Sequence, residues 1–118
     1  MGLAIVRKLR ARGDQVRSFS RGTYPALERL GAESLRGDIA DKAAVLRAAG
    51  DCDIVFHVAA KAGVWGSTES YHRTNVVGTD NVLTACSAEG IKRLVYTSTP
   101  SVTFAGTDQI GVDESAPY

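Results

Sequence analysis

The spacing of apolar residues along the chain predicts a series of short helices. Leu3, Val6 and Leu9 recur every three residues with basic residues between them, which predicts a helix packed on one side over residues 2–12. Gly13 is expected to end this helix. Further helices are predicted over residues 26–30 behind Pro25, over residues 43–48 behind an Asp41 cap, and over residues 68–89.

Between the helices lie segments with strand composition, at residues 15–20, 33–36, 53–58 and 93–97. The segment 53–58 is a nearly continuous apolar run, which is typical of a strand covered on both faces. Strands that alternate with helices predict an α/β fold with a Rossmann-like, doubly wound parallel sheet. From residue 100 onward the pattern is that of a loop.

The beginning of the chain departs from the usual order of such a fold. A dinucleotide-binding fold opens with a strand and a glycine-rich turn that places the pyrophosphate at the first helix. Here the first helix begins at once, and Gly2 is interpreted as the last glycine of that turn. We therefore expect residues 1–118 to be a partial NAD(P)-binding Rossmann domain that lacks its first strand, its glycine-rich turn and its carboxy-terminal part. In the strand order 3-2-1-4-5, the absent strand would lie between the segments 15–20 and 53–58.

Composition excludes several classes of protein. Hydrophobic residues make up 44% and charged residues 23%, as in ordinary globular domains, and the net charge of +1 gives no reason to expect nucleic acid or an anionic membrane as a partner. No apolar run is long enough to span a membrane. Cys52 and Cys86 lack metal-ligand spacing, and we interpret them as buried thiols of a cytoplasmic protein without a metal.

The end of the first visible strand carries Ser20 and Arg21. Dinucleotide folds place an acid here to bind the ribose 2′-hydroxyl of NAD, or an arginine to bind the 2′-phosphate of NADP. No acid is present, and a guanidinium binds a phosphate through two hydrogen bonds. Arg21 therefore indicates NADP, with NAD as the alternative cofactor, although a solvated turn residue would look the same.

Asp38 and Ile39 end the next strand. A carboxylate at this point can accept a hydrogen bond from an adenine amino group, and the Ile39 side chain can pack against the ring. The alternative is a polar turn with a helix cap, and a cap alone is our interpretation of Asp41.

After the central strand, Ala59 and Ala60 are small enough for a cofactor backbone to approach closely. Lys61 could face the cofactor phosphates or be solvated. His57 lies at the buried strand end, and we interpret it as a packed or hydrogen-bonded core histidine rather than a catalyst.

Two further positions are candidates for the reaction centre. Asn75 and Gly78 are poor choices for the middle of a helix, so Asn75 is expected to bridge backbone groups beside the nicotinamide and Gly78 to permit close packing. Thr97, Ser98 and Thr99 close the last strand, where a hydroxyl could donate to a substrate carbonyl oxygen. Three hydroxyls after a strand are also common in simple turns.

Taken in order, these motifs resemble the extended short-chain dehydrogenase/reductase family, also known as the NAD-dependent epimerase/dehydratase family. The matching segments are Gly37–Asp41, His57–Ala60, Asn75–Thr79 and Leu94–Thr99. The resemblance spans essentially the whole chain and implies that Thr99 is the catalytic hydroxyl. Residues 21–25, 60–66 and 98–102 are most similar to the 3β-hydroxysteroid dehydrogenase branch, and within it to bacterial NADP-dependent reductases of β-keto acids.

Two departures from the family pattern matter. Only Gly2 remains of the glycine-rich turn, and the family's Tyr-x-x-x-Lys, which donates the proton, does not occur. Tyr118 is the last residue and is not assigned that role. The chain by itself is therefore expected to be inactive.

The resemblance implies a parent enzyme that transfers a hydride between NADP(H) and a ketone or secondary alcohol, with a β-keto acid or sterol-like small molecule as substrate and a homodimer as its assembly. One alternative is a sugar-nucleotide epimerase or dehydratase, which shares these motifs. The other is a non-catalytic nucleotide-binding protein of the same fold. The downstream sequence would discriminate, through a nucleotide-sugar pocket or through the presence of Tyr-x-x-x-Lys.

Overall fold

The computed structural model describes residues 1–104 and 106–116. The predicted elements form, with bounds that differ by a few residues. The helices are α1 (Gly2–Ala11), α2 (Pro25–Arg29), α3 (Lys42–Ala49), α4 (Thr68–Tyr71), the π-helix η1 (His72–Val77), α5 (Gly78–Ala88) and the 3₁₀-helix η2 (Pro100–Thr103). The strands are β1 (Arg17–Ser20), β2 (Glu33–Arg36), β3 (Ile54–His57) and β4 (Arg93–Tyr96).

The predicted helix over residues 68–89 forms, but it is not a regular α-helix throughout. α4 and α5 are joined by the π-turn η1, which contains Asn75 and directly precedes Gly78. A π-turn widens the helix by one residue, and such insertions occur frequently at functional sites. The two residues that suit a helix interior poorly thus lie within or next to the irregular segment.

The strands form two separate parallel pairs. β1 pairs with β2 in the register Ser20↔Arg36, and β3 pairs with β4 in the register His57↔Tyr96. Within the described residues β1 and β3 do not pair with each other. These pairings agree with the doubly wound order, in which one more strand lies between β1 and β3.

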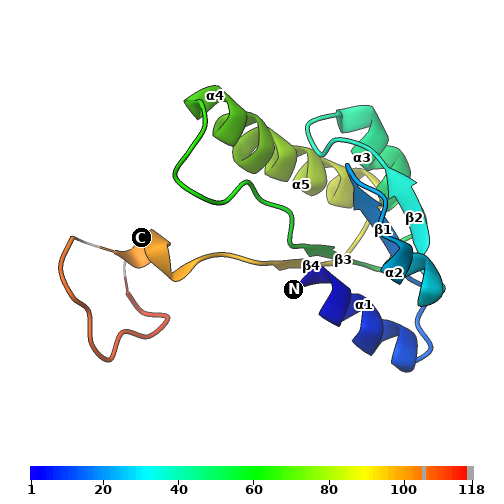
Figure 1. Cartoon of the computed structure of the whole chain (residues 1–118), viewed down its shortest axis with the longest axis horizontal. Helices are drawn as coiled ribbons and strands as arrows, with labels where there is room; N and C mark the ends of the chain where they lie inside the picture. Colours follow the sequence, from blue (N-terminus) through cyan, green and yellow to red (C-terminus); the bar gives the residue numbers. More distant parts are fainter. Residues whose placement is uncertain (105, 117–118) are drawn as a thin grey trace.

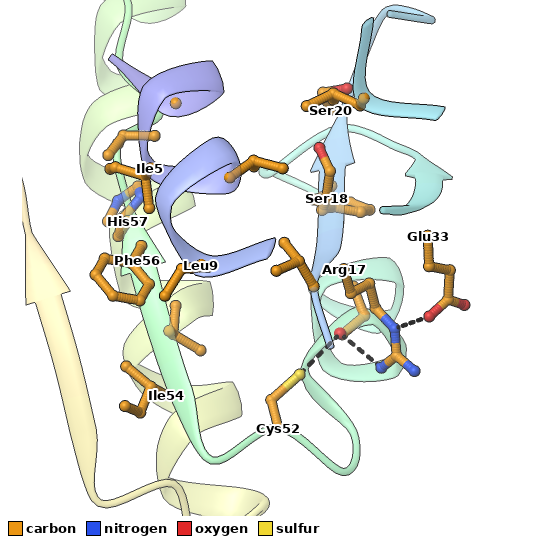
Figure 2. A pocket seen from close by; sticks show the side chains of 18 of the residues that line it. Ile5, Leu9, Arg17, Ser18, Ser20, Glu33, Cys52, Ile54, Phe56 and His57 are labelled. Carbon is orange, nitrogen blue, oxygen red and sulfur yellow. Dashed lines mark hydrogen bonds and ion pairs between the residues drawn. The ribbon is translucent and has the colours of Figure 1, made fainter. Parts of the chain in front are cut away.

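The gap between β1 and β3 is an open cavity of about 1040 Å³. Figure 2 shows α1 lying across it, with Ile5 and Leu9 on the same side as Phe56 of β3. Arg17, which lines this cavity, donates to the carbonyls of Ala48 (3.1 Å) and Gly50 (2.7 Å) at the end of α3.

Helices cover both faces of the strands, as Figure 1 shows: α3 and α5 lie on one side, and α1 and α2 lie on the other. The first side holds the larger core, made of Val45, Ala49, Val82, Ala85 and Cys86, with Phe19, Val55 and Leu94 of the strands packed against it. The second holds Val6, Leu27 and Ala32. Among the described helices none is long and apolar enough to cross a membrane.

His57 is a core residue, as the sequence predicts. Its residue surface is 3% exposed, its ring lies 5.3 Å from the Tyr96 ring, and its Nε2 lies 3.0 Å from Thr79 Oγ1. Because the Thr79 hydroxyl donates to the Asn75 carbonyl at 2.7 Å, it accepts from His57, which assigns the proton to Nε2. Burial lowers the pKa of His57 from its ordinary value of 6.5, since charging the ring in the core is unfavourable.

In the part of the chain that the structure describes, no strand pairs with the inner edges of β1 and β3, and this leads to a prediction about residues 1–118 by themselves. Each buried backbone group without a partner costs about 1–3 kcal/mol, whereas total stabilities are roughly 5–15 kcal/mol. We expect the isolated chain to associate or to lack a cooperative thermal transition. A monomer with a cooperative transition and strong amide protection over Ile54–His57 would contradict this.

The buried His57 predicts a pH dependence of stability. A base whose pKa falls on folding binds its proton more readily when unfolded, so stability is full above about pH 6.5 and decreases as the pH falls from 6.5 through the lowered pKa. In the full-length protein, His57→Gln should make the free energy of unfolding less dependent on pH between about 7 and 5, measured by urea titration. His72→Gln changes an exposed histidine and should retain the native dependence. An unchanged pH profile in His57→Gln would assign the dependence to other groups.

Candidate functional site

The candidate site lies where the carboxyl ends of the strands meet the start of α1. A Cβ placed on Gly2 would lie 3.6 Å from Val58 Cγ2, directly after β3. The Thr97 hydroxyl, directly after β4, donates to Met1 Sδ at 3.6 Å. The amino end of α1 therefore faces the same edge as the ends of β3 and β4, and free backbone N–H groups at a helix start attract anions.

Asp38 is held in the turn after β2 by both of its carboxylate oxygens. Oδ1 accepts from the Ala40 backbone N–H at 3.0 Å, and Oδ2 accepts from Arg73 of η1 at 3.1 Å. The carboxylate side chain remains 37% exposed, so it can still accept a hydrogen bond from a ligand. Asp41 caps α3 by accepting from Ala44 N–H at 3.0 Å, as predicted.

Ile39 contacts α5 through its backbone carbonyl and through its side chain. The buried Asn81 donates to the Ile39 carbonyl at 3.0 Å, and a Cβ on Gly78 would lie only 2.6 Å from Ile39 Cγ2. Only glycine permits this close approach, so the predicted packing role of Gly78 is confirmed. The turn that carries Asp38 and Ile39 thereby has a fixed position relative to the helix.

Ser20 and Arg21 stand at the end of β1, next to the end of β2. The Ser20 hydroxyl donates to the Gly22 carbonyl at 2.9 Å, and Arg36 Nε donates to the Arg21 carbonyl at 3.0 Å. Arg21 and Arg36 are both exposed. The Arg36 guanidinium thus lies against the backbone of Arg21 at this corner of the strand edge, and two exposed arginines there would attract an anion.

The Asn75 side chain holds the segment after β3 by two hydrogen bonds to its backbone, which we call the Asn75 clasp. Its Oδ1 accepts from the Lys61 backbone N–H at 2.7 Å, and its Nδ2 donates to the Lys61 carbonyl at 3.0 Å. Asn75 therefore bridges backbone groups, as predicted. Ala59 and Ala60, just before the clasp, are exposed and present only methyl groups to solvent. The Lys61 ammonium lies over the Tyr71 ring, 4.9 Å from its centroid.

Thr99 lies at the turn between β4 and η2. Its hydroxyl donates to Ser101 Oγ at 3.2 Å and accepts from the Ser101 N–H at 3.3 Å, which caps η2. The side chain is exposed, so a substrate oxygen could replace Ser101 Oγ as the acceptor. Tyr118 lies outside the described residues.

The structure adds Arg36, Arg73 and Asn81 to the residues found from sequence. Each supports a predicted site residue through one hydrogen bond from a distant element. A buried asparagine in the apolar stripe of α5 is a signal that sequence alone could supply, whereas the two exposed arginines resemble any solvated surface residue. Among the described residues, no group of His, Cys, Asp or Glu could hold a metal ion.

Solved structures share this fold. A UDP-glucose 4-epimerase from Thermus thermophilus in complex with NAD matches with a TM-score of 0.85 and 30% identity, over 98% of this chain and 40% of that chain. A short-chain dehydrogenase/reductase superfamily protein from Agrobacterium tumefaciens with bound NAD matches with a TM-score of 0.84 and 29% identity, over 98% of this chain and 35% of that chain. The fold is thus Rossmann-like, as predicted.

Curated relatives are reductases and dehydrogenases. The chain is 54% identical to a 2-alkyl-3-oxoalkanoate reductase of Stenotrophomonas maltophilia and 53% identical to one of Shewanella oneidensis, over 100% of this chain but only 36% and 30% of those proteins. It is 39% identical to a 3 beta-hydroxysteroid dehydrogenase/Delta 5-->4-isomerase of Mycobacterium tuberculosis, over 34% of that protein. The chain therefore spans about a third of the length of these relatives. A family model matches residues 1–118, and the chain belongs to the 3-beta hydroxysteroid dehydrogenase/isomerase family of short-chain dehydrogenases/reductases.

Proposed function

We propose that the full-length protein is an NADP(H)-dependent oxidoreductase that interconverts a ketone and a secondary alcohol. The observation that carries this proposal is the meeting of Arg21, Asp38, the Asn75 clasp and the start of α1 at one strand edge. Reductases named for 2-alkyl-3-oxoalkanoates among the relatives support a β-keto acid as substrate, and the hydroxysteroid dehydrogenases support a sterol-like one.

The residues at this edge fit a dinucleotide. Arg21, beside Ser20 and supported by Arg36, would bind the 2′-phosphate, and Asp38 with Ile39 would receive the adenine. The start of α1 at Gly2 and the methyl-lined segment Ala59–Ala60 would lie along the pyrophosphate. Lys61 would contribute positive charge there, and Asn75 would support the nicotinamide side. When bound, the nicotinamide supplies or accepts the hydride.

Thr99 would orient the reacting oxygen of the substrate. Its hydroxyl is exposed at the strand end and can donate to an oxygen on which negative charge develops. The proton donor would be the tyrosine of a Tyr-x-x-x-Lys motif, which residues 1–118 do not contain. By the family resemblance, residues 1–118 would form part of the NAD(P)-binding domain of a cytoplasmic homodimer.

A sugar-nucleotide epimerase is the second candidate, because UDP-glucose 4-epimerases are among the structural neighbours. The two activities share the cofactor half and differ in what the protein does with the oxidised substrate. Assaying the full-length protein with NADPH and a 2-alkyl-3-oxoalkanoate, and in parallel with UDP-glucose, separates them. Turnover of UDP-glucose without ketone reduction would reject the proposal.

The role of Arg21 predicts cofactor preference. In the full-length protein, Arg21→Asp should weaken NADPH binding by about 1–3 kcal/mol, because a charge-assisted contact with the 2′-phosphate is replaced by repulsion. The measurement is kcat/KM for NADPH relative to NADH. Arg93→Asp, at the exposed start of β4 and thus at the opposite edge, is the matched control and should leave the ratio unchanged. An unchanged ratio in Arg21→Asp would show that Arg21 is not the phosphate ligand.

The role of Thr99 predicts a loss of turnover. Thr99→Val should lower kcat by about 10²–10³-fold, as does removal of an oxyanion donor elsewhere, whereas Thr99→Ser should largely retain activity. Ser101→Ala removes the present acceptor of the Thr99 hydroxyl and should leave kcat near the native value. A fully active valine variant would transfer the role to Ser98 or remove it altogether.

A further inference from the structure

A chain of hydrogen bonds joins the buried His57 side chain to the helix packed against it. His57 is the last residue of β3 (Figure 2), and its Nε2 donates to the Thr79 hydroxyl at 3.0 Å. The Thr79 hydroxyl in turn donates to the Asn75 carbonyl at 2.7 Å. Both distances are those of ordinary hydrogen bonds, and an apolar side chain could fill the same core position without needing either of them. The bonded pair therefore indicates a role for His57 beyond filling space.

The Asn75 carbonyl that accepts from Thr79 belongs to the π-turn η1. In a π-turn the backbone hydrogen bonds no longer follow the α-helical spacing, and a threonine hydroxyl can bond the carbonyl four positions before it. Thr79 thus holds Asn75 by its main chain, while the Asn75 amide holds both backbone groups of Lys61 at 2.7 and 3.0 Å. Asn75 is therefore fixed at its main chain and at its side chain.

These contacts form a closed ring, which we call the anchoring ring. Its members in order are His57, Thr79, Asn75, Lys61 and residues 58–60, which lead back along the chain to His57. Both ends of the segment 58–60 are thus attached to the same stretch of helix. A segment of three residues that is held at both ends has little freedom to move, and this one contains the methyl groups proposed to lie along the cofactor.

The main chain of His57 links the anchoring ring to the end of β4. Its carbonyl accepts from the Thr97 backbone N–H at 3.0 Å, two positions before Thr99. Its imidazole lies 5.3 Å from the Tyr96 ring. One member of the anchoring ring therefore also holds the strand end whose hydroxyl is proposed to orient the substrate. Replacing the His57 side chain leaves the carbonyl in place, so the side-chain contact can be tested separately.

We propose that His57 and Thr79 are positioning residues for the cofactor, which act through Asn75 by holding residues 58–60 in the conformation that receives the nicotinamide half of the dinucleotide. The inference rests on the proposed function and deepens it, because neither residue is among those proposed to contact the cofactor. Without the anchoring ring the segment is free to move in the unbound protein. Binding then has to order it, which lowers the affinity.

The test measures the Kd values of two ligands for the full-length protein by calorimetric titration. NADPH carries both halves of the dinucleotide, whereas adenosine 2′,5′-bisphosphate carries the adenine and the 2′-phosphate without the nicotinamide. Thr79→Val replaces the hydroxyl by a methyl group, and should raise the Kd of NADPH by about tenfold because NADPH then has to order the segment. The Kd of the bisphosphate, which does not reach the segment, should stay unchanged. Thr79→Ser keeps the hydroxyl and should restore NADPH binding.

Further variants locate the effect in the anchoring ring. Asn75→Ala opens the clasp directly and should show the same selective loss for NADPH. His57→Phe keeps an aromatic ring beside Tyr96 but removes the N–H that reaches Thr79, and should also weaken NADPH selectively. The double variant of His57→Phe and Thr79→Val should bind NADPH no more weakly than the weaker single variant, because residues that act through one bond are not additive. Thr84→Val, on α5 outside the anchoring ring, is the matched control and should bind both ligands as the native protein does.

The outcomes are distinguishable. Equal weakening of both ligands in Thr79→Val, or native Kd values together with a lowered Tm, would assign the pair to folding alone and overturn the inference. Additive losses in the double variant would overturn it as well, since His57 and Thr79 would then act separately. If Thr79→Val does not fold, the same comparison of the two ligands is made with His57→Phe and decides in the same way. A native protein that does not bind NADPH would instead reject the proposed function.

Discussion

The packing of α3 against α5 joins the two halves of this structure. β1 pairs with β2 and β3 pairs with β4, and in the described part of the chain no backbone ladder connects the pairs. The apolar cluster around Val45, Val82 and Ala85 contacts Phe19 of β1 and Val55 of β3. Because apolar contact is non-directional, this cluster holds the strand pairs on one side of the helices without itself fixing their register. The spatial relation between the two ends of the candidate site depends on this contact.

The continuous helix from α4 through η1 to α5 contacts both parts of the candidate site and holds them in place. Gly78 and Asn81 fasten the turn after β2, and Asn75 fastens the segment after β3. The π-turn η1 lies between these attachment points and carries Arg73, which reaches Asp38. One helix thus sets the separation between the turn after β2 and the segment after β3, where the adenine and the nicotinamide are proposed to lie. A change that shifts this helix would move both sides at once.

The fold is shared with proteins named for different activities. A UDP-glucose 4-epimerase of Thermus thermophilus superimposes over 98% of this chain, and the curated relatives at 54% and 53% identity are named reductases. One fold therefore serves more than one reaction, so the substrate is not determined by the order of strands and helices.

The sequence by itself determined the order of strands and helices, the cap at Asp41, the core position of His57 and the positions of the motifs. These features depend on local periodicity and on residue types whose conformational preferences act over a few positions. It also marked Asn75 and Gly78 as unsuited to a regular helix, although not that the helix forms a π-turn there. The tertiary structure alone decided that Arg36 supports Arg21, that Arg73 reaches Asp38 from 35 positions away, and that Asn81 reaches Ile39 from 42 positions away. Contacts of this range depend on how helices pack across the sheet, and hydrophobic periodicity specifies which face is buried but not which partner it meets.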